Sequence, residues 1–264
     1  MLLKRVLSAL VGIPLLLYFI YLGDIWYTLI VWLIAVIGLR EYFQMMRLSD
    51  KVLFFSGFVG LTALLAAVHL GSLETVLVVI TLLFLWIALN LVFRFNRSTL
   101  EETSLFFWGI IYIGGLLGYL VMLRQEFVFE FTVILIAAVW LNDTFAYFVG
   151  NAWGKRKLMP AVSPAKSVEG SLGGLLGTIL LSILLYFLIP DFYQLSLVLT
   201  VGLVFIIIIF AQIGDLVESA LKRKLEVKDS GSFIPGHGGI LDRFDSMMYA
   251  APFAYYYIFL INYL

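Results

Sequence analysis

The 264-residue sequence contains no cysteine, and charged residues make up only 13% of it. The absence of cysteine excludes disulfides, thiolate metal sites and thiol nucleophiles. Charged residues are about half as frequent as the roughly 25% that is usual in soluble domains. The formal net charge is zero, so the overall charge points to no class of partner.

Apolar residues are correspondingly frequent in the sequence. They form 63% of the chain, and the mean hydropathy is +1.06. A soluble core does not need this share, so the composition predicts a protein embedded in a bilayer. The basic and then apolar N-terminal stretch MLLKRVLSALVGIPLLLYFIYLG resembles a signal peptide. Its apolar run is long for the apolar region of a signal peptide and no small-residue cleavage site follows it, so we expect a retained first helix.

A membrane-spanning helix needs about 20 mostly apolar residues. Nine ranges fit this description: 6–23, 25–39, 52–71, 74–93, 104–123, 131–150, 170–189, 194–214 and 246–263. The predicted fold is therefore an all-α integral membrane protein with about nine transmembrane helices. We divide it into N-terminal membrane helices at 1–130, with about five spans, and a catalytic membrane region at 131–264. That region has about four spans and two cytoplasmic polar loops, 151–169 and 215–245.

The basic residues predict how these helices are oriented. If the N-terminus is cytoplasmic, all but one of the 17 Lys and Arg residues fall in cytoplasmic segments, and the exception is Arg124. Cytoplasmic loops of membrane proteins carry an excess of Lys and Arg. We therefore expect a cytoplasmic N-terminus, an external C-terminus, and both polar loops at the cytoplasmic face.

The first polar segment, residues 141–174, combines an intramembrane carboxylate with a basic loop. Asp143 lies amid apolar residues, where a charge usually faces a polar cavity, although a structural hydrogen bond to a neighbouring helix is the alternative. Pro164 predicts a turn. Ser167 is placed to cap the next helix, with Glu169 in its first turn. Lys166 would then stand at a helix N-terminus, a good place for a phosphate, although basic loops also simply set topology.

The second polar segment begins where an apolar run ends, at Asp215. If the helix continues there, one face carries Asp215, Glu218, Ser219, Lys222 and Arg223. A solvated helix face would explain most of these residues, but not Asp215. Further on, Asp242 and Asp245 are three apart at the start of the last predicted helix, as metal ligands or as simple helix caps.

Together these groups indicate a reaction on phosphates. Three carboxylates at membrane depth, Asp215, Asp242 and Asp245, with no cysteine and one nearby histidine, suit Mg²⁺ rather than zinc. Neighbouring Lys and Arg side chains suit phosphate oxygens. We therefore expect phosphoryl or nucleotidyl transfer on a lipid at the cytoplasmic membrane surface.

At these residues the sequence resembles the phosphatidate cytidylyltransferase family, also called CDP-diacylglycerol synthases. The family signature is filled without a gap by Ser219, Leu221, Lys222, Arg223, Lys228, Asp229, Gly231, Ile234, Pro235, His237, Gly238, Gly239, Ile240, Asp242, Arg243, Phe244 and Asp245. The stretch SPAKSVEG, from Ser163, and the pair Gly214 and Asp215 also resemble the family. The resemblance covers roughly the C-terminal half of the chain.

The resemblance implies the transfer of a cytidylyl group from CTP to phosphatidate. It also implies an inner-membrane enzyme with two bound cations near the aspartates, Mg²⁺ and a second one, and a homodimer. We expect a catalytic set of Asp215, Asp242, Asp245, Lys222 and Arg223, in which the three aspartates hold the metal. We expect substrate contacts from Asp143, Ser163, Lys166, Ser167, Glu169, Ser219, Lys228, Asp229, His237 and Arg243.

Two other readings remain open at this point. A CDP-alcohol phosphotransferase would also use membrane aspartates, but its differently spaced pattern is absent. A transporter would usually show internal repeats, and we find none. The expected partners are CTP, phosphatidate, the lipid bilayer and a second copy of the chain, with no nucleic acid. The lack of a eukaryotic targeting extension favours a bacterial cell membrane.

Overall fold

The computed structural model describes residues 2–96, 99–233 and 238–263. The chain forms two compact units, and each unit is built from separate stretches of sequence. Unit 1 contains residues 1–126 and 227–243, and unit 2 contains residues 127–226 and 244–264. The chain therefore passes from one unit to the other three times.

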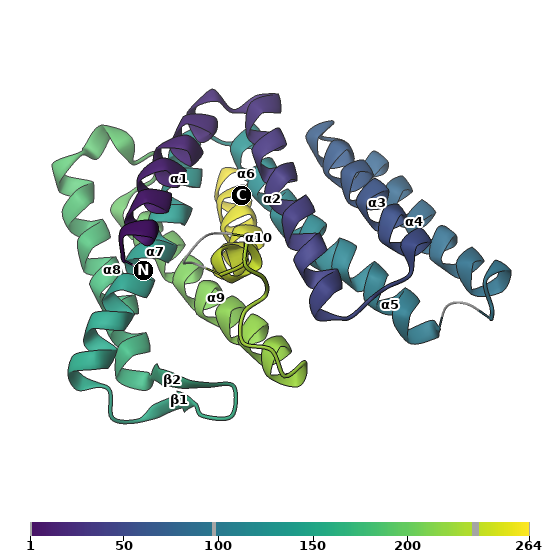
Figure 1. The fold of residues 1–264 in the computed structure, drawn as a ribbon. Coiled ribbons are helices and arrows are strands. Elements are labelled where there is room, and N and C mark those ends of the chain that lie inside the picture. The colour runs from purple at the N-terminus through teal and green to yellow at the C-terminus, as the bar shows by residue number, and fades with distance from the viewer. Residues whose placement is uncertain (1, 97–98, 234–237, 264) are drawn as a thin grey trace. The chain divides into compact units, whose positions relative to one another are not determined.

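Unit 1 is a bundle of apolar helices joined by short loops (Figure 1). Its helices are α1 (Leu2–Leu22), α2 (Asp24–Met45), α3 (Lys51–His69), α4 (Leu73–Phe93), α5 (Leu100–Gly109), the π-helix η1 (Ile110–Gly115) and α6 (Leu116–Glu126). The last three follow one another without a break and make one long helix. Polar residues start several of these helices, because a side-chain oxygen there satisfies otherwise unpaired backbone N–H groups.

Two caps illustrate how local sequence starts the helices of unit 1. Asp50 accepts hydrogen bonds from the backbone N–H groups of Val52 and Leu53 at the start of α3. Thr99 and Glu102 form a reciprocal capping box at the start of α5. The buried ring of Phe43 on α2 then packs against rings from α3 and α5, which fixes these helices against one another.

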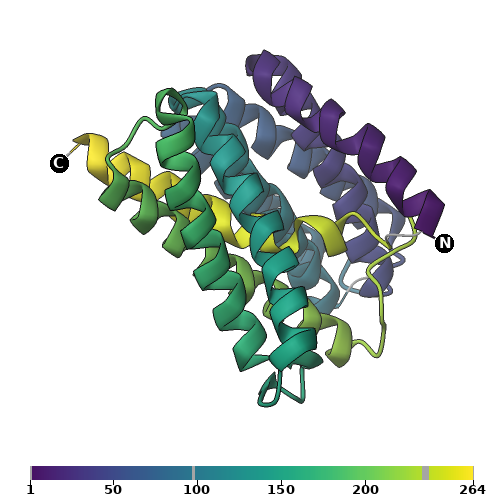
Figure 2. The same cartoon turned by 90° about the vertical axis from the view of Figure 1, so that its left-hand side faces the viewer.

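Unit 2 contains α7 (Phe129–Trp153), β1 (Lys157–Met159), β2 (Ser163–Ser167), α8 (Val168–Leu188), the short 3₁₀ helix η2 (Pro190–Phe192), α9 (Leu197–Lys224) and most of α10 (Leu241–Tyr263). Figure 2 shows α7 and α8 running side by side, with the β-hairpin at one end of the pair. A Cβ atom at Gly173 of α8 would lie 2.4 Å from Val149 of α7, so this close packing requires a glycine.

Each of the nine predicted ranges falls mostly on a helix. Seven helices among the described residues are long and apolar enough to cross a membrane: α2, α3, α4, the helix Leu100–Glu126, α7, α8 and α9. The other two ranges fall on α1, whose described apolar part is Leu10–Leu22, and on α10, which begins with three charged residues within five positions. The protein is a multi-pass membrane protein.

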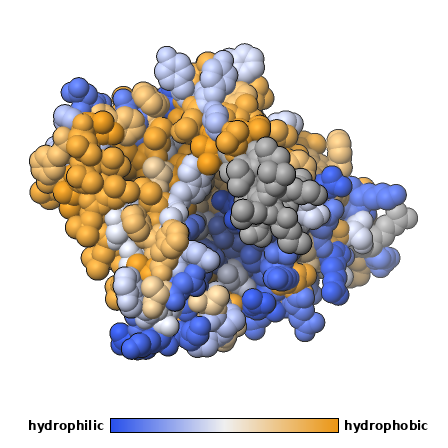
Figure 3. All heavy atoms as spheres, turned by 60° about the vertical axis from the view of Figure 1, so that its left-hand side comes forward, coloured by the Kyte–Doolittle hydropathy of each residue, from blue (hydrophilic) through white to orange (hydrophobic). Residues whose placement is uncertain are grey.

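The surface of the protein agrees with contact to lipid. Apolar side chains four residues apart on α8 are exposed, from Leu172, at 50%, to Leu180, at 66%. Apolar side chains, drawn in orange in Figure 3, cover much of the surface in that view. An apolar surface of this kind is stable in lipid but not in water.

Candidate active site

The loop after α7 is a β-hairpin, which the sequence does not predict. Strands β1 and β2 pair antiparallel, with Lys157 opposite Ser167 and Met159 opposite Ser163. The prediction of a turn at Pro164 is wrong, because Pro164 lies within β2 and the chain turns at residues 160–162. A proline is tolerated at an edge position, where its missing N–H is not needed for pairing.

The hairpin leads directly into α8, and Ser167 caps that helix as predicted. Its hydroxyl accepts a hydrogen bond from the backbone N–H of Gly170 at 3.1 Å. Glu169 in the first turn reaches back to the start of the hairpin. Its carboxylate accepts hydrogen bonds from the backbone N–H groups of Lys155 and Arg156, both at 3.1 Å. Glu169 therefore ties the hairpin to α8, while its predicted contact with a substrate stays a prediction.

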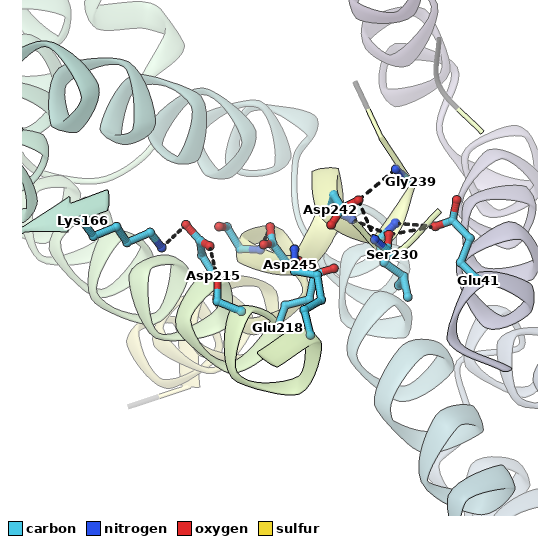
Figure 4. Close-up of polar contacts among 12 residues, drawn as sticks. Glu41, Lys166, Asp215, Glu218, Ser230, Gly239, Asp242 and Asp245 are labelled. Carbon is cyan, nitrogen blue, oxygen red and sulfur yellow. Dashed lines mark hydrogen bonds and ion pairs between the residues drawn. The ribbon is translucent and has the colours of Figure 1, made fainter. Parts of the chain in front are cut away.

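Helix α9 continues to Lys224, well beyond its apolar run. The prediction of a shared polar face required the helix to continue there, and this requirement is confirmed. At the start of this polar part, Asp215 forms an ion pair with Lys166 of β2. Both side chains are about one-third exposed. Figure 4 shows them pointing toward each other, and the hydroxyl of Ser219, one turn further along α9, donates a hydrogen bond to Asp215 at 3.4 Å.

A second carboxylate pair lies between α9 and α10. Glu218 and Asp245 are 2% and 8% exposed, and each carboxyl group lies within electrostatic range of the other. Lys222, one turn further along α9, donates a hydrogen bond to Glu218 at 3.2 Å. Gly214 permits the approach of α10, because a Cβ there would lie 2.7 Å from the carbonyl oxygen of Asp245.

A pocket of about 330 Å³ opens beside the Lys166–Asp215 pair, wholly within unit 2. It is lined by Asn142, Asp143, Ala146, Tyr147, Gly150, Asn151, Leu158, Ala165, Lys166, Ser167, Gly170, Ser171, Gln212 and Asp215. Four of the predicted site residues are among them. Asp143 is exposed to this space, as expected of an intramembrane carboxylate that faces a polar cavity.

Gln212 is a polar pocket residue that was not predicted from the sequence. The side-chain amide of Gln212 donates hydrogen bonds to Oδ1 of Asn142 at 2.9 Å and to the carbonyl oxygen of Ser171 at 3.1 Å. It thereby joins α7, α8 and α9 at the floor of the pocket. The signal that could have indicated it is a single amide within the apolar run LVFIIIIFAQIG.

The charges of unit 2 favour a bound cation. Asp143 lies within electrostatic range of both Asp215 and Asp245, and Asp245 lies beside Glu218. Two lysines, Lys166 and Lys222, partner this group of four carboxyl groups. Carboxylate oxygens without sulfur or imidazole suit Mg²⁺ in their chemistry. As they stand, no three Asp, Glu or His side chains among the described residues are grouped closely enough to hold an ion.

The glycine-rich part of the signature belongs to unit 1, and we call its described residues, 227–233 and 238–240, the signature loop. Asp242, just after the loop on α10, accepts hydrogen bonds through Oδ2 from the backbone N–H groups of Ser230 at 3.0 Å and Gly239 at 2.9 Å (Figure 4). Gly238 has a φ of +86°, which favours glycine. Asp242 and Asp245 thus stand one turn apart on α10, but in different units.

The remaining predicted site residues lie in several places. Arg223 donates a hydrogen bond at 3.2 Å to the carbonyl oxygen of Val162, at the turn of the hairpin. Ser163 begins β2. Lys228, Asp229 and Arg243 belong to unit 1, and all three are exposed. His237 lies outside the described residues.

Comparison with known proteins gives a match over almost the whole chain. The family model described as "Cytidylyltransferase family" matches residues 3–261. A protein of Bacillus subtilis (strain 168) with the name "Phosphatidate cytidylyltransferase" is 34% identical over 278 residues, which covers 98% of each chain.

Two staphylococcal proteins with the same name are also similar. That of Staphylococcus haemolyticus (strain JCSC1435) is 32% identical over 260 residues, which covers 94% of this chain and 95% of the relative. That of Staphylococcus aureus (strain COL) is 34% identical over 251 residues, with the same coverage. The similarity therefore includes the N-terminal helices, where the sequence pattern alone indicates only apolar spans.

Proposed function

The chain belongs to the cytidylyltransferase family and transfers a cytidylyl group from CTP to phosphatidate, and we propose that the pocket of unit 2 holds the CTP. The products of the reaction are CDP-diacylglycerol and pyrophosphate, so the protein is a nucleotidyltransferase of phospholipid biosynthesis. The observation that carries the proposal is a pocket in which a lysine amine, a helix N-terminus and two carboxylates meet.

We propose that the triphosphate of CTP binds at the start of α8. The first backbone N–H groups of a helix and its dipole attract phosphate oxygens. Lys166 precedes this helix and adds a mobile positive charge, and Ser167 adds a hydroxyl. The cavity of about 330 Å³ lies at the lower end of the range for small-molecule sites.

The proposed chemistry needs no strong base. An oxygen of the phosphatidate phosphate attacks the α-phosphorus of CTP, and the bond to the pyrophosphate leaving group breaks. A phosphate monoester has a second pKa near 6, so it is largely a dianion at neutral pH. The protein must instead bring two polyanions together, and Lys166 and Lys222 supply positive charge beside the carboxylates. We give His237 the role of a hydrogen-bond donor to phosphate, not that of a base.

We propose Asp215 and Asp245 as metal ligands, because both belong to the group of four carboxyl groups in unit 2 and Lys166 already places one cation on Asp215. A bound Mg²⁺ ion, with a second cation, would neutralise phosphate charge as it develops in the transition state. Asp242, one helical turn from Asp245, is proposed as the third ligand, and its charge is tested separately below. Asp143, exposed in the pocket, is proposed to contact the substrate or its metal.

The other substrate contacts are proposed from the signature and the hairpin. Basic side chains suit phosphate oxygens, and short hydroxyl and carboxyl groups suit the polar parts of CTP. These residues are Ser163, Glu169, Ser219, Arg223, Lys228, Asp229, His237 and Arg243. Arg223 has a second task in the structure, because it holds the turn of the hairpin through the carbonyl oxygen of Val162.

We further propose about nine spans, a cytoplasmic N-terminus, an external C-terminus and a site at the cytoplasmic face. The distribution of Lys and Arg supports this orientation, with Arg124 as the exception. The named relatives are bacterial, which supports a bacterial cell membrane. A homodimer remains part of the proposal, since exposed apolar helix faces can bind either lipid or a second copy.

The decisive experiment is an assay of purified protein with labelled CTP, phosphatidate and a series of Mg²⁺ concentrations. We expect CDP-diacylglycerol that depends on all three components. The variant Asp245→Asn should lose nearly all turnover, while Asp191→Asn, in η2 of the same unit, should keep it. If the unmodified protein forms no CDP-diacylglycerol, the function is wrong. If Asp245→Asn turns over normally, only the metal assignment fails.

A further inference from the structure

Glu41, on α2, is a buried carboxylate outside every motif named above. Glu41 is 4% exposed, and both of its carboxylate oxygens accept hydrogen bonds. Oε1 accepts from the backbone N–H of Ile240, and Oε2 from that of Leu241, both at 3.0 Å. We propose that Glu41 is a positioning residue for the reaction, which holds the signature loop and the start of α10 in place.

The contacts of Glu41 extend from α10 to the other end of the signature loop. The hydroxyl of Ser230 donates a hydrogen bond to Oε2 of Glu41 at 3.3 Å, and its backbone N–H donates to Oδ2 of Asp242. Asp242 in turn accepts from the backbone N–H of Gly239. The carboxylates of Glu41 and Asp242 therefore bind residues on both sides of the loop. Ser230 forms hydrogen bonds with both carboxylates, as Figure 4 shows.

The position of Glu41 also explains two glycines of the loop. A Cβ atom on Gly231 would lie 2.5 Å from Oε1 of Glu41, and one on Gly239 would lie 2.6 Å from Oε2. Both distances are well below van der Waals contact. The loop thus carries glycines where the carboxylate approaches its backbone most closely, which is the pattern expected when backbone and a charged group must meet.

A carboxylate buried this deeply is costly unless its charge is compensated. In the part of the chain that the structure describes, Glu41 forms no ion pair with Lys or Arg. Its compensation comes from two backbone N–H groups at the N-terminus of α10, where the helix dipole favours negative charge, and from one hydroxyl. These are directed bonds, so they fix the orientation of the first turn of α10 and the position of Asp242.

The inference rests on the proposed role of the signature residues in turnover. If Glu41 only sets the position of the loop, its loss should lower kcat, because reacting groups displaced by about 1 Å can cost roughly a hundredfold in rate. The KM for CTP should stay unchanged, since every residue of the proposed CTP pocket belongs to unit 2. None of these residues is a hydrogen-bond partner of Glu41 among the described residues.

The test uses Glu41→Gln in the full-length, detergent-purified protein. The amide replaces one carboxylate oxygen by an NH₂ group, so at least one of the three donors loses its acceptor. We expect kcat to fall roughly tenfold to a hundredfold with the KM for CTP unchanged. We also expect faster hydrogen–deuterium exchange in peptides from the signature loop, and unchanged exchange in α7 and α8.

The matched control is Asp50→Asn, which alters another carboxylate of unit 1 that accepts two backbone N–H bonds at a helix start. It should leave kcat and loop exchange unchanged. Should Glu41→Gln fail to accumulate, Ser230→Ala removes one of its three bonds and should change kcat and loop exchange in the same direction, by a smaller factor. The exchange measurement needs no turnover, so it separates this inference from the proposed function.

Several outcomes would overturn the inference. The inference is wrong if Glu41→Gln keeps the kcat of the unmodified protein, or if it loses kcat while loop exchange stays unchanged. It is also wrong if Asp50→Asn shows the same loss of kcat and the same change in loop exchange as Glu41→Gln. If Glu41→Gln is too unstable to purify, a Ser230→Ala protein with unchanged kcat and unchanged loop exchange would also overturn the inference.

Discussion

Replacing Lys166 by Ala removes the cation that pairs with Asp215 beside the start of α8. Both side chains of the pair are about one-third exposed, so water screens part of the attraction. The contact at stake is the one that Lys166 makes with a CTP phosphate. A hydrogen bond to a charged group contributes about 1.5–3 kcal/mol. At about 1.4 kcal/mol for each factor of ten, the KM for CTP should rise roughly tenfold to a hundredfold.

The assay is an initial-rate measurement in mixed micelles, with CTP varied at saturating phosphatidate and then the reverse. The KM for phosphatidate should not change. Lys157→Ala, an exposed lysine on β1 of the same hairpin, is the control for a general loss of positive charge and should leave both constants unchanged. An unchanged KM for CTP together with a raised KM for phosphatidate would refute the reasoning and assign the hairpin to the lipid.

Three further predictions concern the metal, the topology and the stability of unit 1. Asp242→Asn should fold, because an amide oxygen can accept both bonds that end on Oδ2, yet lose nearly all turnover if the charge holds Mg²⁺; normal turnover would remove Asp242 from the metal site. A reporter fused after Leu264 should work only if it functions outside the cytoplasm, and a signal from a cytoplasm-only reporter would exclude the nine-span topology. The Arg94 guanidinium beside Asp50 holds the pKa of that carboxyl below its usual range, so its stabilising effect is present above about pH 4 and is lost as the pH falls through the lowered pKa. Asp50→Asn should therefore lower the Tm at pH 7 and make less difference in acid, and an equal difference at both pH values would contradict this ion pair.

The helices are the most predictable part of this protein because of the solvent in which they fold. In lipid, each spanning segment must satisfy its own backbone hydrogen bonds, so a long apolar run predicts a helix reliably. The hairpin after α7 has no such signal. Its strands are short and polar, and a proline that usually marks a turn lies within β2.

The candidate site is predictable in its residue types and less so in its contacts. Single polar residues in apolar surroundings, such as Asp143 and Asp215, already indicate a site in the sequence. The bond from Gln212 to Asn142 joins residues 70 positions apart, and that from Leu241 to Glu41 joins residues 200 positions apart. Such pairings depend on how helices pack, which periodicity does not reveal. The division into functional regions at residue 130 stays a prediction.

The interleaving of the two units has a consequence for the order of events during synthesis. Domains generally fold in the order in which the ribosome produces them, starting from the N-terminus. Unit 1 cannot follow that order, because its last piece, residues 227–243, is made after three helices of unit 2. The hydrogen bonds from Ile240 and Leu241 to Glu41 can form only after most of the chain has been synthesised. Until then unit 1 lacks these bonds, so truncated chains that end before residue 240 should be degraded rather than accumulate half-folded.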